Sequence, residues 1–157
     1  MHLLMEPTIR RARLSDAPTL TAFNAAMALE TEHLMLDPTV LAAGVRAGLE
    51  DENKARYFVA EMDGVVVGQL MLTLEWSDWR NGDIWWIQSV YVHPQSRRKG
   101  VFSAIYRHVE KLANESKAAG LRLYVEQHNQ AGQQTYTQLG MGLTEYLVME
   151  TMFAKRP

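Results

Sequence analysis

The sequence contains no cysteine among its 157 residues. A chain without thiols cannot form disulfides, thiolate metal sites or a cysteinyl intermediate, so these three kinds of chemistry are excluded. The chain also has little excess charge, with 16 Lys and Arg against 18 Asp and Glu and a formal net charge of −2. Since no global field attracts nucleic acid or an anionic membrane, a polyanionic ligand would need a local basic cluster.

Long apolar runs are also missing, because no segment reaches the length of a membrane span. The first nine residues include Glu6 and Pro7 and do not resemble a signal peptide. The five histidines lack the spacing of metal ligands, so no metal site is predicted. A hydrophobic fraction of 47% suits one globular domain over residues 1–157, which we expect to be soluble and cytoplasmic.

The hydrophobic pattern changes period several times along the chain. Helical spacing predicts helices near residues 15–32, 37–50, 100–120 and 131–139. Alternating or β-branched runs predict strands at residues 9–13, 57–62, 65–74, 84–92, 121–125 and 143–153. Asp63-Gly64 is a hairpin signal, whereas a helix separates 84–92 from 121–125, so these two strands should be parallel. The order predicts a mixed α/β domain.

The turn between residues 94 and 100 is the strongest chemical signal in the chain. It contains Arg97, Arg98 and Lys99 and ends at Gly100, which can turn the backbone tightly into the next helix. The amides of residues 99–103 would then point together at a helix N-terminus and bind an anion, for which a pyrophosphate is the natural guest. The same residues would also suit an exposed basic turn that only caps a helix.

Two segments resemble the GNAT N-acetyltransferase superfamily. The passage Gln88–Pro94, followed by Arg97–Gly100, is similar to its acetyl-CoA-binding motif. The passage Leu121–Val125, followed by Asn129 and Tyr136, is similar to its later segment of strand, Asn and Tyr. Phe102 and Met141 depart from the family pattern, in which a small residue and Phe are usual. The resemblance covers Thr8 to Phe153 and implies a mostly antiparallel central sheet with a splayed parallel pair and flanking helices.

The resemblance also implies an acetyl-CoA site without a metal. The main chain of residues 90–92 would pair with the pantetheine arm, and the amide of Tyr91 or Val92 would stabilise the oxyanion. Tyr136 would be the general acid for the departing thiolate. The implied cofactor-binding residues are Val90, Tyr91, Val92, Arg97, Arg98, Lys99, Gly100, Val101, Phe102, Ser103, Asn129 and Tyr136.

The general base and the acceptor site have weaker signals. Glu126 is one candidate base, Glu75, Glu30 and Glu32 are others, and Gln88 could orient a water molecule. All four tryptophans fall within residues 76–86 among acids, a pattern that suits a cationic or aromatic amine but also a sheet core or a dimer contact. The candidate substrate-binding residues are Glu30, Glu32, Trp76, Trp79 and Gln88.

The function implied by the resemblance is direct transfer of an acetyl group from acetyl-CoA to a primary amine of a small molecule or peptide, through a ternary complex. The alternative is a catalytically silent CoA-binding regulatory or sensor module of the same fold. Nucleic acid binding through Arg97 to Lys99 is disfavoured, because three basic residues neutralise few phosphates. No membrane partner is expected, and a homodimer would be usual for the family.

Overall fold

The computed structural model describes residues 5–154 and divides the chain into two compact units. The first unit ends at Leu123 and the second begins at Tyr124. The first unit contains the β-sheet with three α-helices, and the described part of the second contains one α-helix.

The sheet of the first unit has five strands in the order β1-β2-β3-β4-β5. They are β1 (Thr8–Arg11), β2 (Arg56–Met62), β3 (Val65–Ser77), β4 (Gly82–Val92) and β5 (Gly120–Leu123). Neighbouring strands are antiparallel except β4 and β5, which are parallel. The predicted mixed sheet is confirmed, because three antiparallel strands in a row are followed by a parallel crossover.

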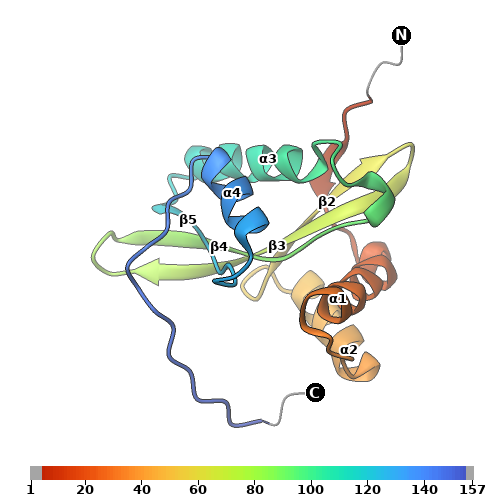
Figure 1. Ribbon diagram of the computed structural model, residues 1–157, viewed down its shortest axis with the longest axis horizontal. Helices are drawn as coiled ribbons and strands as arrows, with labels where there is room; N and C mark the ends of the chain where they lie inside the picture. The colour runs from red at the N-terminus through yellow and green to blue at the C-terminus, as the bar shows by residue number, and fades with distance from the viewer. Residues whose placement is uncertain (1–4, 155–157) are drawn as a thin grey trace. The chain divides into compact units, whose positions relative to one another are not determined.

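Helices cover both faces of this sheet (Figure 1). The helices are α1 (Ala17–Glu32), α2 (Pro38–Glu50) and α3 (Val101–Glu115), with short 3-10 turns η1 (Leu14–Asp16) and η2 (Pro94–Ser96). Helix α3 lies against the face that carries Gly68, since a Cβ there would meet Val101 at 3.0 Å and Ile105 at 3.4 Å. Helices α1 and α2 pack on the opposite face. The crossover between β4 and β5 therefore runs through η2 and α3 on a single face.

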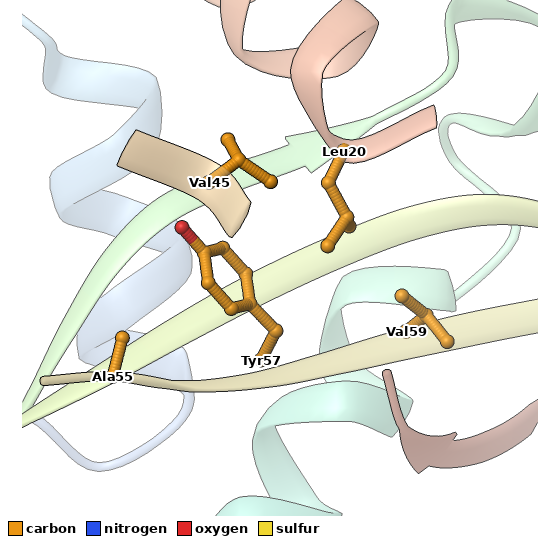
Figure 2. Close-up of a cluster of buried hydrophobic side chains, with 5 residues drawn as sticks. All are labelled: Leu20, Val45, Ala55, Tyr57 and Val59. Carbon is orange, nitrogen blue, oxygen red and sulfur yellow. The ribbon is translucent and has the colours of Figure 1, made fainter. Parts of the chain in front are cut away.

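A cluster of buried apolar side chains joins α1 and α2 to β2 (Figure 2). It consists of Leu20, Val45, Ala55, Tyr57 and Val59, each at most 6% exposed. Tyr57 and Val59 point to one face of β2, whereas Phe58 between them points to the other and contacts His108 of α3. This alternation is how one strand contributes to the packing of both helical layers.

In the second unit, helix α4 spans Gln130–Gln138, close to its predicted bounds. The predicted strand at 143–153 is wrong, because these residues form no strand and pair with none in residues 5–154. Leu147 is 92% exposed and Met149 96%. Strand propensity reflects packing on a pleated surface rather than an intrinsic backbone preference, and these side chains have little packing. The strand predicted to reach Val125 likewise ends at Leu123.

An ion-paired carboxylate anchors the start of α1 to the sheet. Asp16 is 9% exposed and accepts two hydrogen bonds from the Arg10 guanidinium, at 2.8 and 3.0 Å, and one from the Arg13 amide at 2.6 Å. Arg10 also donates to Glu61 at 2.9 Å. The hydrogen bonds from Arg10 hold the pKa of Asp16 below its usual value. The ionised carboxylate therefore stabilises the fold at neutral pH.

We expect Asp16→Asn to lower the free energy of unfolding at pH 7 by about 2 kcal/mol, because hydrogen bonds to a charged group are lost. A carboxyl whose pKa is depressed by folding stabilises the protein above its ordinary pKa of about 4 and loses this effect as the pH falls. The difference in the free energy of unfolding between the wild type and Asp16→Asn, measured by urea titration, should therefore become smaller below a pH of about 4. Glu52→Gln, which removes an exposed partner of Arg11, is the control with little expected effect. A difference in the free energy of unfolding that stays constant at acidic pH would contradict this role of Asp16.

Candidate functional site

The parallel pair diverges halfway along β4. Strand β5 pairs with β4 only from Ile84 to Ile87, and its last partner is Leu123. Strand β4 continues to Val92 while still paired with β3 on its other side. Residues 88–92 therefore have one edge that pairs with no strand of the sheet. An unpaired strand edge is a ready acceptor for an extended ligand with amide groups of its own.

A β-bulge lies at the beginning of this free edge. Between the pairs Gln69↔Tyr91 and Met71↔Gln88, strand β3 advances two residues and β4 advances three. Ser89 takes up the extra residue with φ of 50°, in the left-handed region. The fully buried Gln69 donates from Nε2 to the Ser89 carbonyl at 3.0 Å. The bulge reorients the amides that follow it, and the hydrogen bond from the Gln69 side chain holds it in place.

The residues after β4 are those for which the sequence predicts a cofactor site, and residues 94–100 are therefore called the cofactor loop. It includes η2 and ends at Gly100, whose φ of 73° and ψ of 12° are left-handed. Gly100 is the N-cap of α3, no side chain caps that helix, and a Cβ on Gly100 would meet no heavy atom within 4 Å. The first amides of an α-helix have no intrahelical partner. No side chain in the described part of the chain therefore caps the start of α3, which fits a pyrophosphate group at this helix N-terminus.

The three basic residues of the loop have different environments. Arg98 and Lys99 are exposed beside Gly100, and Arg98 is also left-handed with φ of 61°. Arg97 instead donates from Nε to the Val92 carbonyl at 2.8 Å and forms an ion pair with Glu30 at 2.8 Å. The sequence predicts that all three residues belong to one anion-binding cluster. The structure separates Arg97, which contacts α1 and β4, from its two neighbours.

Tyr91 lies beneath Arg97 and is 6% exposed. Its ring is 5.0 Å from the ring of Phe23, the Arg97 guanidinium lies 5.3 Å above it, and its hydroxyl donates to Glu30 at 3.2 Å. The pKa of Tyr91 is raised mainly by burial and also by the Glu30 carboxylate. The hydrogen bond from Arg97 lowers the pKa of Glu30. Tyr91 therefore stays neutral and Glu30 ionised at neutral pH.

A set of polar and aromatic side chains continues along the sheet on the face of Gln69 and Met71. Gln88 donates to the Thr73 hydroxyl at 2.6 Å, Arg122 donates to Glu75 at 3.1 Å, and the Arg122 guanidinium lies 5.6 Å above the Trp86 ring. We call this set the polar sheet face: Thr73, Glu75, Trp86, Gln88 and Arg122. It begins next to the bulge, and among its members Thr73 and Arg122 were not suggested by the sequence.

The tryptophans do not gather on this face. Trp76 is an even-numbered residue of β3 and lies on the side of Leu72 and Leu74, opposite Thr73 and Glu75. Trp79 is in the turn beyond β3 and is 88% exposed. Trp85 lies under Arg56, whereas Trp86 lies under Arg122, so the expected separation of these two neighbours is confirmed. The structure does not bring Trp76 or Trp79 together with Gln88.

The second unit carries three of the predicted residues. Asn129 is the N-cap of α4, and its Oδ1 accepts from the Gly132 amide at 2.9 Å. The Glu126 carboxylate accepts from the His128 amide at 2.8 Å and is exposed. Tyr136 is partly buried, and burial raises its pKa, so its hydroxyl keeps its proton at neutral pH. It therefore has the protonation state that a general acid needs.

The described residues contain neither a metal-binding cluster nor a helix that could span a membrane. Between residues 5 and 154, no group of three His, Asp or Glu side chains is arranged to hold a metal ion. None of the helices in that range combines the length and the apolar character required to cross a bilayer.

Comparison with known proteins places the chain among acetyltransferases. The model of the acetyltransferase (GNAT) family matches residues 22–141. A crystal structure of a possible acetyltransferase from Clostridium difficile 630 is 41% identical, with a TM-score of 0.89 over 96% of this chain and 100% of that one. A ribosomal-protein-alanine N-acetyltransferase from Brucella melitensis biovar Abortus 2308 is 20% identical, with a TM-score of 0.77 over 94% and 99% of the two chains, and shares the fold.

A transcriptional regulator from Bacillus halodurans C-125 is also 20% identical, with a TM-score of 0.80 over 94% of this chain and 99% of that one. The curated protein sequences contain no match. The family match covers well over half of the chain, and the predicted resemblance is confirmed. The protein belongs to the GNAT family of acetyltransferases.

Proposed function

We propose that the protein transfers the acetyl group of acetyl-CoA directly to a primary amine of a small molecule or peptide, in a ternary complex. The observation that carries the proposal is the free edge of β4 from residue 88 to 92, which leads directly into the uncapped N-terminus of α3. An extended pantetheine arm needs backbone partners, and a pyrophosphate needs clustered amides. The two features follow each other along the chain in the order that CoA requires.

In this proposal the cofactor is held by main chain and by two basic residues. The main chain of residues 90–92 pairs with the pantetheine arm, and the amides of residues 99–103 bind the pyrophosphate. Arg98 and Lys99 add positive charge, and Asn129 stays a predicted cofactor-binding residue. Acetyl-CoA supplies the activated thioester, and an amide of Tyr91 or Val92 next to the bulge stabilises the oxyanion.

Direct transfer is favoured because the sequence contains no cysteine that could carry the acetyl group. The acceptor amine must lose its proton before attack, since a lysine-like amine has a pKa of about 10.4. Glu126 remains our candidate base, and Gln88, which lies next to the bulge, could orient a water molecule that relays the proton. Tyr136 is the candidate acid that protonates the CoA thiolate.

The acceptor is proposed to bind beside the bulge, where the polar sheet face begins. Gln88 is the predicted substrate-binding residue that this position supports best. Glu32, Trp76 and Trp79 stay predictions, as do the cytoplasmic location and the homodimer. We propose small amines and peptide amines as acceptors. We propose neither nucleic acid nor a membrane as a partner.

A silent CoA-binding sensor is the second candidate. One observation favours it: Glu30 and Glu75, two of the three carboxylates predicted near the site in the first unit, are held in ion pairs with arginine. The hydrogen bond from Arg97 lowers the pKa of Glu30 and makes it a weaker base than a free carboxylate. The sensor would bind acetyl-CoA through the same β4 edge and α3 terminus without turnover.

Purified protein should release free CoA thiol from acetyl-CoA in the presence of at least one amine from a panel of polyamines, arylamines, lysine peptides and peptides with a free α-amine. Thiol release is followed with a chromogenic disulfide, and acetylated products are identified by mass. Calorimetry with CoA measures binding separately. Binding without release for any amine would favour the sensor, and absence of binding would contradict both candidates.

Tyr136→Phe should lower kcat by roughly a hundredfold, because a general acid contributes on the order of that factor or more. The KM for acetyl-CoA should stay close to that of the wild type, since only the proton donor is removed. Tyr146→Phe is the matched control, because Tyr146 lies in the same unit and is 79% exposed. An unchanged kcat in Tyr136→Phe would remove Tyr136 from the acid role.

Gly100→Ala should weaken CoA binding and destabilise the fold by about 1 kcal/mol, because Ala in a left-handed conformation is strained. No clash contributes, since the added Cβ has open space. Gly44→Ala makes the same change inside α2, also in open space, and should stabilise the protein by about 0.5 to 1 kcal/mol with unchanged CoA affinity. Urea titration and calorimetry measure the two quantities. Normal CoA affinity in Gly100→Ala would place the pyrophosphate elsewhere.

A further inference from the structure

The last turn of α1 reaches the cofactor loop through a single carboxylate. Both oxygens of Glu30 are engaged, because Oε1 accepts from the Tyr91 hydroxyl at 3.2 Å and Oε2 accepts from Arg97 Nη2 at 2.8 Å. The two partners lie 61 and 67 residues away in the sequence. Glu30 thus joins three elements, namely α1, the end of β4 and the cofactor loop.

Arg97 is held from three directions. Its Nη2 donates to Glu30, its Nε donates to the Val92 carbonyl at 2.8 Å, and its guanidinium lies 5.3 Å above the ring of Tyr91. A planar guanidinium that is fixed at both a ring face and two acceptors has a defined orientation, which Lys could not reproduce. Because Tyr91 is buried against Phe23, this surface is a rigid support for Arg97.

The loop needs such support because of its backbone. Immediately after Arg97, two residues of the loop are left-handed, Arg98 with φ of 61° and Gly100 with φ of 73°. The first of them is not glycine and therefore carries a conformational cost of about 1 kcal/mol or more. Such a conformation persists only where the surrounding contacts maintain it. The contacts made by Arg97 are the ones nearest in sequence to the left-handed Arg98.

The charges of Glu30 and Arg97 indicate that their contact supports the loop and does not bind a ligand. The hydrogen bond from Arg97 holds the pKa of Glu30 below its usual value, so the pair is ionised at neutral pH. Glu30 neutralises Arg97, whereas Arg98 and Lys99 lie exposed next to the uncapped amides of α3. The positive charge available to a phosphate therefore belongs mainly to residues 98 and 99.

We propose that Glu30 is a positioning residue that braces the cofactor loop through Arg97 and Tyr91, and thereby ties α1 to acetyl-CoA binding. The proposal rests on the proposed function for its cofactor. It replaces the predicted substrate-binding role of Glu30, since neither carboxylate oxygen is free of a hydrogen bond. It also assigns Arg97 to the support of the loop and leaves direct contact with the phosphates to the amides, Arg98 and Lys99.

The loop itself can be tested without any ligand, because Arg97, Arg98 and Lys99 are trypsin sites. Glu30→Gln keeps the shape of the side chain and removes its charge, so we expect cleavage after residues 97–99 of the native protein to accelerate by about threefold to tenfold. Peptide masses identify the cleaved bonds. Glu50→Gln is the matched control, since Glu50 on α2 also forms an exposed ion pair with an arginine at 2.8 Å, in this case with Nε of Arg46.

CoA binding and turnover then test the functional consequence. Glu30→Gln should raise the Kd for CoA and the KM for acetyl-CoA by about threefold to tenfold, with kcat at saturating acetyl-CoA near the wild-type value. In an Arg97→Ala background, which removes the ion pair, the same substitution should have little further effect, because Glu30 acts mainly through Arg97. Glu50→Gln should change none of these quantities.

Three results would overturn the brace. Unchanged cleavage together with unchanged CoA affinity would mean that the contact does not order the loop. Tighter CoA binding in Glu30→Gln would make Arg97 a phosphate ligand that Glu30 restrains. A fall in kcat at saturating acetyl-CoA, with normal Kd, would return Glu30 to the acceptor site. If wild-type protein does not bind CoA, the proposed function fails, and the trypsin comparison still decides whether Glu30 braces the loop.

Discussion

The fold depends on how the two edges of β4 are used. One edge pairs with β3 along nearly the whole strand, whereas the other pairs with β5 only from Ile84 to Ile87. Backbone groups that pair with no strand must find another partner when they are covered. The half of β4 that β5 does not pair with is thus a place where a ligand with its own amides can bind, and this half is unpaired because β5 is short. The crossover helix α3 begins at the same end of β4, so main-chain pairing and anion binding adjoin.

The bulge at Ser89 imposes a second demand, which Gln69 meets. A bulged residue leaves the regular ladder and its carbonyl needs a new donor. Gln69 supplies one from a fully buried position, while its own Oε1 has no hydrogen-bond partner within residues 5–154. Burying an amide with an unpaired acceptor costs free energy that an apolar residue would not. A strand built only for stability would carry an apolar side chain here, so the bulge itself is the feature that Gln69 maintains.

Most of the first unit could be predicted from the sequence, because its signals are local. The Asp63-Gly64 turn, the helix start at Asp37 and Pro38, and the glycine before α3 all act within a few residues. The role of Arg97 could not be predicted in this way. Its partner Glu30 is 67 positions away, and nothing in a run of three basic residues distinguishes the one that faces a carboxylate.

The acceptor side and the C-terminal segment escaped prediction for related reasons. A cluster of tryptophans in the sequence suggested one aromatic surface, but strand alternation and a hairpin turn send Trp76, Trp79 and Trp86 in different directions. The pairs that do form, such as Arg122 with Glu75, join β5 to β3 across β4, and the two residues are 47 positions apart in the sequence. The residues 143–153 have strand composition, yet composition cannot specify a partner, and pairing is what makes a strand.

The distribution of charge around Glu30 gives the near-neutral composition a more specific meaning. If the three basic residues of the cofactor loop were equivalent, they would repel one another and favour an open loop in the absence of an anion. Pairing Arg97 with Glu30 removes one of these charges from the repulsion and uses it to hold the loop closed onto Tyr91. The loop can then be ordered before its ligand arrives, and less ordering remains to be done on binding. Because the carboxylate comes from α1, a helix that also packs on the sheet, the ion pair joins the loop to that helix, and the contacts of Tyr91 with Glu30 and Phe23 join the end of β4 to the same helix.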